Sequence, residues 1–341
     1  MGKRNASVET FRCLLMFLIV LGHAFSHGIW STTTGWWTLL FSTLIIWHVD
    51  GFVGISGWFG IKFSWMKFAR LWGLCLFYTV LGAAYQYCFA RPSFSIKSLV
   101  VHGGWFTGTY MMLMMIAPIL NAGLEQLHKK SPRALLAAWG GVALGVMANW
   151  CPGHLMTGMK VGGGHDYSIL TMIFVYVSAR CARLLELDRL PLRKLMLAPI
   201  AFVGGIVVLG GVQQLYMVAL KGLPFEPSSF RYWTVYQAPH VAAMAIGMVL
   251  IFVSHVKVPA VVGKFADFCA PSMFGVYLMS DTTSFGPLLY RIPQKWFSDS
   301  NIPWLVIILT AISTFLICLA FDLCRRFALR VASRPKLIAM L

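Results

Sequence analysis

The chain has 341 residues, of which 58% are hydrophobic and 11% are charged. This composition excludes an ordinary soluble domain, because the apolar segments reach about 20 residues, the length at which a helix crosses a bilayer. The net charge of +17 would suggest a nucleic-acid partner in a soluble protein. Here the Lys and Arg residues gather between apolar segments, so we interpret them as a topology signal and expect no nucleic-acid partner.

The apolar segments have helical length, and none shows the short alternating pattern of a transmembrane barrel. We therefore predict an all-α polytopic membrane protein with about ten transmembrane helices and membrane lipid as its first partner. No internal repeat or low-complexity linker divides the sequence, so we expect one integral-membrane domain over residues 1–341. The predicted spans are 10–29, 37–60, 69–89, 106–123, 133–150, 167–184, 196–219, 233–256, 266–285 and 303–328.

The distribution of Lys and Arg sets the orientation of these spans. If the N-terminus is cytoplasmic, the inside segments hold 20 of the 28 Lys and Arg residues and the outside segments hold 7, with Arg12 at the inner mouth of the first span. An excess of positive charge marks cytoplasmic segments. We therefore predict that both termini are cytoplasmic.

The first predicted span carries Glu9 and Arg12 near its start and His23 deep inside. Ionisable side chains are rare in spans, because a charge or unpaired donor in hydrocarbon costs about 3 kcal/mol or more unless it faces protein or water. Arg12 and His23 are eleven residues apart, which places them on one helical face, separated by about 16 Å along the axis. This pair is the first candidate for a functional site.

The spacing of Arg12 and His23, with Glu9 three residues before the arginine, resembles the opening helix of the acyltransferase-3 family of integral-membrane O-acyltransferases. Other segments are similar to motifs that this family shows in the same order. They are Val53–Phe59 (VGISGWF), Lys67–Arg70 (KFAR), the fourth span from Trp105 through Tyr110 to Asn121, and Phe274–Leu278 (FGVYL). Two positions depart from the family pattern: Lys67 replaces a common Arg, and Ser280 replaces a common His.

The resemblance implies an O-acyltransferase of the plasma (inner) membrane. It implies acetyl-CoA or another acyl-CoA as the cytoplasmic donor, and a hydroxyl of a cell-surface polysaccharide or lipid-linked glycan as the acceptor, with no metal. The partners would then be membrane lipid and a carbohydrate or glycolipid. The sequence leaves open whether the acyl group passes directly or through an acyl-histidine, and whether copies of the chain form a homo-oligomer.

His23 is the predicted general base, because imidazole has a reference pKa of about 6.5 and can take a proton from a hydroxyl near neutral pH. The alternative is a histidine satisfied by hydrogen bonds between helices. Asp50 is the second catalytic candidate, since a lone carboxylate inside a span must pair or protonate. A salt bridge to Arg12 or Arg70 and orientation of the His23 ring are both open for it.

Donor binding is assigned to the cations at the inner face. Guanidinium groups match phosphate oxygens in two-point contacts, so Arg12, Lys67 and Arg70 are the expected phosphate ligands of coenzyme A. Each is also explained as a topology signal. Glu9 either orients Arg12 or serves as a favourable charge at a helix N-terminus.

Acceptor binding is assigned to the outer side, where Trp105 and Tyr110 offer aromatic faces and Asp281 a carboxylate. Packing and membrane-interface roles are the alternatives for the two aromatic residues. A different class of function is a transporter or flippase for a lipid-linked sugar, with His23, Arg12 and Asp50 as a relay. Two halves with matching broken helices would favour that class, and the sequence shows no such pairing.

Overall fold

A computed structural model describes residues 5–28, 36–89, 104–156, 169–222, 233–281, 285, 287–291 and 303–332. Every regular element among these residues is a helix, which confirms the prediction of an all-α protein. Within these described ranges, six helical segments are long and apolar enough to cross a bilayer, and two shorter helices are also apolar. The chain is therefore an all-α membrane protein with several apolar helices.

Each predicted span falls on one helix or on consecutive helices. The elements are α1 (Ala6–Gly28), α2 (Trp36–Ile45), α3 (His48–Phe59), α4 (Trp65–Phe89), α6 (Gly104–Lys130), α7 (Pro132–Met156), α8 (Ile169–Leu184), η1 (Leu187–Arg189), α9 (Leu192–Leu195), α10 (Leu197–Lys221), α12 (Pro239–Ser254), α13 (Ala260–Cys269), η2 (Ala270–Ser272), α14 (Met273–Asp281), η3 (Pro287–Arg291) and α16 (Pro303–Ala332). The number of membrane crossings and their orientation stay predictions.

The chain divides into two compact units. Unit 1 comprises residues 1–31, 71–104 and 258–341, and unit 2 comprises residues 32–70 and 105–257. We describe each unit by itself.

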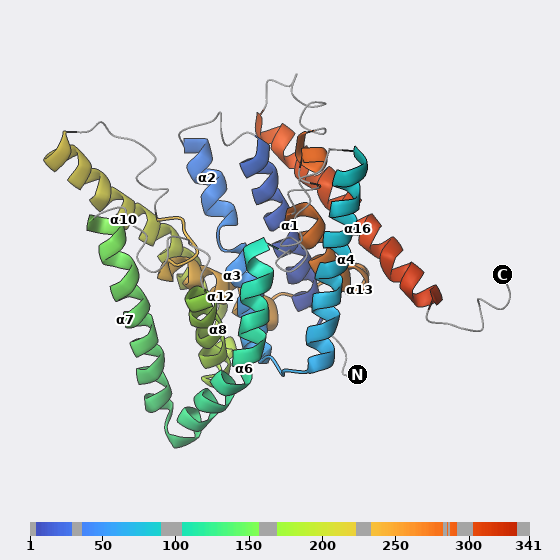
Figure 1. Ribbon diagram of the computed structural model, residues 1–341. Helices are drawn as coiled ribbons and strands as arrows, with labels where there is room; N and C mark the ends of the chain where they lie inside the picture. The colour runs from blue at the N-terminus through green and yellow to red at the C-terminus, as the bar shows by residue number, and fades with distance from the viewer. Residues whose placement is uncertain are drawn as a thin grey trace. The chain divides into compact units, whose positions relative to one another are not determined.

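Unit 1 is built around α1 (Figure 1). Val8, Phe11, Leu15 and Ile19 are buried, and their spacing of three or four residues puts them on one side of the helix. The helix packs against α13, α14 and α16. Because three elements surround it, α1 brings its polar side chains close to groups from the C-terminal part of the chain.

The ninth predicted span, 266–285, is interrupted in the structure. The chain forms α13, the 3₁₀ turn η2 and then α14, which has only nine residues. Pro271 lies in the turn, and a proline has no N–H to continue a helix that has already begun. The 3₁₀ turn separates α14 from α13, and Asp281 is the last residue of α14.

Unit 2 has α3 at its centre, packed on α8 and α12. Its core joins Val53, Leu113, Val175 and Tyr176, all almost fully buried. Helices α6 and α7 form a hairpin, drawn in green in Figure 1. The second predicted span, 37–60, is divided in this unit, because α2 ends at Ile45 and α3 begins at His48.

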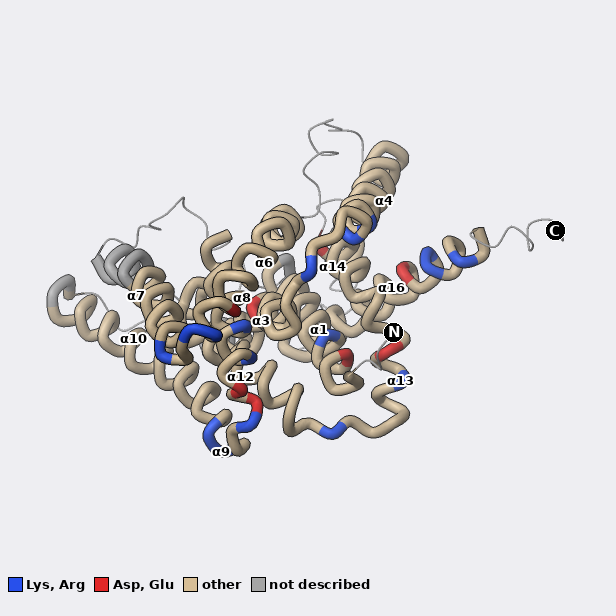
Figure 2. The backbone as a smooth tube through the Cα atoms, turned by 90° about the horizontal axis from the view of Figure 1, so that it is seen from below, with Lys and Arg blue, Asp and Glu red and all other residues tan. Residues whose placement is uncertain are grey.

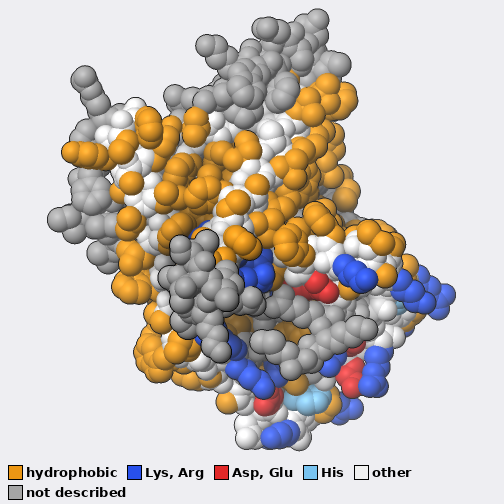
Figure 3. Space-filling model, turned by 90° about the vertical axis from the view of Figure 1, so that its right-hand side faces the viewer, with side chains coloured by type: hydrophobic (Ala, Val, Ile, Leu, Met, Phe, Trp, Pro, Cys, Tyr) orange, Lys and Arg blue, Asp and Glu red, His pale blue; other side chains and the backbone are white. Residues whose placement is uncertain are grey.

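Charged side chains are unevenly distributed. Lys and Arg lie mainly near helix ends and in connecting segments (Figure 2). On the face drawn in Figure 3, hydrophobic side chains cover the upper part, whereas Lys, Arg, Asp and Glu gather in the lower part. An apolar band next to a charged end is the pattern expected of helices that meet lipid along part of their length.

We predict that Gly57→Ala destabilises the protein. A Cβ at Gly57 would overlap the carbonyl oxygen of Tyr176 and lie 3.0 Å from the Cβ of Ala179, so α3 and α8 would have to separate. Overpacking of this kind costs about 1–3 kcal/mol. Denaturant unfolding in detergent should show the loss.

The matched control is Gly204→Ala in α10, where a Cβ meets nothing within 4 Å. Alanine has a higher helix propensity than glycine, so this variant should be at least as stable as the parent. Equal stability of the two variants would contradict the close packing of α3 on α8.

Candidate active site

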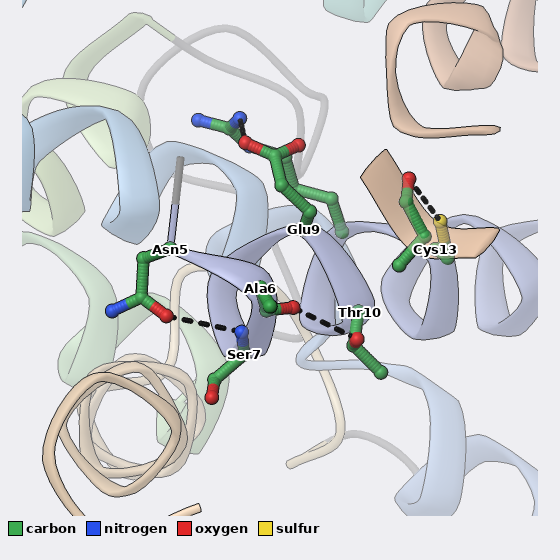
Figure 4. Close-up of polar contacts among 8 residues, drawn as sticks. Asn5, Ala6, Ser7, Glu9, Thr10 and Cys13 are labelled. Atoms are coloured by element: carbon green, nitrogen blue, oxygen red, sulfur yellow. Dashed lines mark hydrogen bonds and ion pairs between the residues drawn. The ribbon is translucent and has the colours of Figure 1, made fainter. Parts of the chain in front are cut away.

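The beginning of α1 holds an ion pair. Arg12 Nη1 donates to Glu9 Oε1 at 2.7 Å, one helical turn away. Figure 4 shows the Glu9 carboxylate and the neighbouring contacts, including the bond from the Thr10 hydroxyl to the carbonyl oxygen of Ala6. The Glu9 side chain is 6% exposed and that of Arg12 is 36% exposed. Glu9 therefore orients Arg12 while part of the guanidinium stays accessible.

His23 lies on α1, on the same helical face as Arg12, and contacts a carboxylate. Its Nε2 is 3.4 Å from Asp281 Oδ1, and both side chains are 21% exposed. Asp281 comes from the end of α14, more than 250 residues away in sequence. Unit 1 thus brings together an imidazole and a carboxylate that the sequence analysis had assigned to different roles.

Two tyrosines complete the surroundings of this pair. The Tyr277 hydroxyl donates to Asp281 Oδ2 at 2.7 Å. The Tyr290 ring lies edge-on to the imidazole, with centroids 6.5 Å apart, and its hydroxyl donates to the Ser280 carbonyl oxygen at 3.1 Å. The two oxygens of Asp281 therefore have different partners, which fixes the orientation of the carboxylate.

This arrangement has a definite chemical capacity. A carboxylate beside one nitrogen of a histidine selects the tautomer and stabilises the imidazolium that forms when the ring accepts a proton. The distance of 3.4 Å is slightly longer than the usual N–H···O range, and catalytic hydrogen bonds often tighten when substrate binds. His23 is accordingly equipped to serve as a general base.

The other predicted donor ligands lie at the beginning of α4. Lys67 and Arg70 are both exposed there. They belong to unit 2, whereas Arg12 belongs to unit 1. A shared cationic collar of the three residues therefore stays a prediction.

Asp50 lies in the first turn of α3 and is only 3% exposed. Within the described ranges its carboxylate makes no hydrogen bond or ion pair, and its Oδ2 atom is buried. The salt bridge considered with Arg70, in the same unit, does not form. Arg12 and His23 belong to the other unit, so their relation to Asp50 stays a prediction.

Trp105 and Tyr110 lie near the start of α6, and both are partly exposed. Trp105 is 5.9 Å from Tyr236, measured between ring centroids. Tyr110 stacks on Phe106, and its hydroxyl is 3.0 Å from Ser56 Oγ. The contact with Ser56 joins two segments that resemble family motifs, and the partial exposure leaves aromatic surface on this part of α6.

Sequence reasoning missed the partners of the site. Tyr277 carried a usable signal, because it precedes Asp281 by four residues and therefore shares its helical face. For Tyr290, no spacing in the sequence indicated a contact with His23. A third group, Tyr78, Asp322 and Arg325, forms a buried polar network in unit 1. Asp322 and Arg325 are three residues apart in an apolar segment, and that spacing could have indicated a pair.

The comparisons with known proteins agree with these observations. A family model described as an acyltransferase domain of the acyltransferase-3 family matches residues 5–323. Neither the search of curated proteins nor the search of solved structures found a significant match. The family match covers nearly the whole chain, including α1 with Arg12 and His23 and α14 with Asp281. The chain therefore belongs to the acyltransferase-3 family and is a membrane acyltransferase.

Proposed function

We propose that the protein is an O-acyltransferase of the plasma (inner) membrane that takes an acyl group, most simply acetyl, from cytoplasmic acyl-CoA. The acceptor is a hydroxyl of a cell-surface polysaccharide or a lipid-linked glycan. The observation that carries this proposal is the contact between His23 and Asp281 inside a chain of an acyltransferase family. Such a pair supplies the base that an unactivated sugar hydroxyl needs.

The proposed transfer begins when the His23 imidazole takes the proton of the acceptor hydroxyl. The hydroxyl oxygen attacks the thioester carbonyl carbon, a new C–O bond forms, and the C–S bond breaks. The proton then passes from the imidazolium to the departing thiolate, which leaves as coenzyme A. Asp281 holds the ring in position and stabilises its charged form, while Tyr277 holds Asp281.

The donor is proposed to enter from the cytoplasmic side. Arg12, fixed by Glu9 and about one-third exposed, offers guanidinium donors to the phosphates of coenzyme A. Lys67 and Arg70 are exposed and supply further positive charge. Arg12 and His23 are about 16 Å apart along α1, a separation that the pantetheine arm of the donor would bridge.

The acceptor is proposed to bind on the outer side. Trp105 and Tyr110 present aromatic surface, whose negatively polarised faces suit the C–H groups of a sugar ring. Asp281 was also expected to contact the acceptor, and its position beside His23 supports an orienting role. Asp50 remains a second catalytic candidate, because a buried carboxylate without a partner in the described chain calls for an explanation.

The proposal includes ten spans with both termini in the cytoplasm, which rests on the distribution of Lys and Arg. In this orientation, Arg12 faces the donor side and His23 lies deeper in the membrane. The family match does not favour the alternative of a transporter or flippase with His23, Arg12 and Asp50 as a relay.

We predict that His23→Ala leaves a folded protein without acyl transfer. A general base contributes about 10²–10⁴-fold to a rate, and alanine has no group that can take the proton. The measurement is transfer of radiolabelled acetyl groups to glycans in vesicles. His255→Ala, at the end of α12, is the control and should keep parental activity. Activity of His23→Ala within tenfold of the parent would refute the assignment.

Asp281→Asn distinguishes an orienting role from acceptor binding. If Asp281 orients the imidazole, kcat should fall about tenfold or more, because part of the effect of the base depends on its orientation. The KM values for both substrates should stay within about threefold of those of the parent. A raised KM for the acceptor with unchanged kcat would instead identify Asp281 as an acceptor ligand.

Arg70→Ala tests the donor collar. Removing a charge-assisted hydrogen bond costs about 1.5–3 kcal/mol, so the KM for acetyl-CoA should rise about tenfold or more, while kcat changes little. Arg193→Ala in α9 is the matched control, because Arg193 is also exposed and also assigned to the inner side. A loss of kcat with an unchanged KM would count against the collar.

A further inference from the structure

A polar network lies in unit 1 apart from His23 and Asp281. Asp322 on α16 is fully buried, and its Oδ1 accepts hydrogen bonds from the Tyr78 hydroxyl and from Arg325 Nε, both at 2.8 Å. Tyr78 belongs to α4, so the carboxylate joins two helices that are far apart in sequence. Arg325 also lies over the Phe77 ring, 5.9 Å from its centroid.

A third helix, α14, passes directly against this network. A Cβ at Gly275 would overlap Asp322 Oδ1 and lie 3.0 Å from the Tyr78 hydroxyl oxygen. Glycine is therefore required for α14 to come this close. The Asp322 carboxylate therefore lies directly against the backbone of α14 at Gly275.

Arg326, which follows Arg325 on α16, binds the segment that precedes α14. Arg326 Nη1 donates to the carbonyl oxygen of Phe268 at 3.1 Å and to Ser272 Oγ at 2.8 Å. Ser272 ends η2, and α14 begins at the following residue. Two successive turns of the α13–η2–α14 segment are thus attached to one end of α16.

The other end of α14 carries the candidate site. Gly275 and Asp281 are six residues apart, which is about 9 Å of helix. A short helix moves as a rigid body, so a shift at Gly275 is transmitted to Asp281. Its contact with His23 measures 3.4 Å, slightly longer than the usual N–H···O range, so a displacement of about 0.5 Å decides whether the two groups form a hydrogen bond.

We propose that Asp322, held by Tyr78 and Arg325, is a positioning residue that sets the place of α14 and thereby the distance between Asp281 and His23. This inference rests on the proposed function, in which that pair is the base of an acyltransferase. Stability alone explains the network poorly, because buried ion pairs are often replaced by apolar groups without loss of stability. A fixed charge between three helices instead specifies one arrangement of them.

The test compares Asp322→Asn and Tyr78→Phe with Asp281→Asn in the full chain in lipid nanodiscs. We expect Asp322→Asn to lower kcat at least tenfold, with KM values within threefold, and to shift the pH profile of kcat in the same direction as Asp281→Asn. Tyr78→Phe removes only a hydroxyl, should fold, and should show a smaller loss of about threefold. The control Asp188→Asn, which removes a carboxylate that pairs with Arg183 in unit 2, should leave kcat unchanged.

The double variant separates positioning from a general structural defect. If Asp322 acts through Asp281, the variant with Asp322→Asn and Asp281→Asn should be within twofold of Asp281→Asn alone. Multiplied losses, or a parental kcat for both Asp322→Asn and Tyr78→Phe, would overturn the proposal.

A readout without acyl transfer keeps this test distinct from that of the proposed function. The rate at which diethyl pyrocarbonate modifies His23, followed by peptide mass spectrometry, should change equally in Asp322→Asn and Asp281→Asn and stay parental in Asp188→Asn. If the parent transfers no acyl group from acetyl-CoA, the proposed function fails, and this rate still decides the positioning. A parental modification rate in Asp322→Asn would overturn it.

Discussion

The contact between the His23 imidazole and the Asp281 carboxylate is the interaction on which the candidate site depends. Apolar helices gain little from polar side chains, which must find partners or meet water. In unit 1, Asp281 on α14 contacts His23 on α1 with one oxygen, and its other oxygen accepts a hydrogen bond from Tyr277 on the same helix. The pair therefore joins α1 to α14 and is the centre of the proposed chemistry.

Much of the fold follows from local sequence. Apolar runs of helical length predicted the long helices, since burial and backbone hydrogen bonding both favour helices in such segments. They did not predict the short elements η1, α9 and η3, or the first part of α13. The interruption at Pro271 had a signal in the sequence, because proline lacks the N–H that a helix needs. That signal does not decide a break by itself, since α6 continues through Pro118. The break between Ile45 and His48 could not be predicted from the sequence, since no Gly or Pro lies there. After the break, α3 packs on α8 and α12.

The site was predictable only along one helix. The periodicity of α1 puts Arg12 and His23 on the same face, and Glu9 within reach of Arg12, so this part could be derived from spacing alone. The partner of His23 could not be derived from spacing, because Asp281 is far away in the sequence and no rule of spacing connects α1 with α14. Asp50 shows the converse: its burial was predictable, whereas its lack of a partner in the described chain was not.

Asp322 and Asp281 in unit 1 differ in burial and in partners, and the difference matches their proposed roles in positioning and in catalysis. Asp322 is fully buried and accepts two hydrogen bonds at one oxygen, so its charge is fixed in place. Asp281 is about one-fifth exposed and lies beside an imidazole, so it responds when that ring gains a proton. A general base is effective only in a fixed geometry, so the proposed mechanism would use both properties. Helix α14 joins them, because it contacts Asp322 at Gly275 and carries Asp281 at its end.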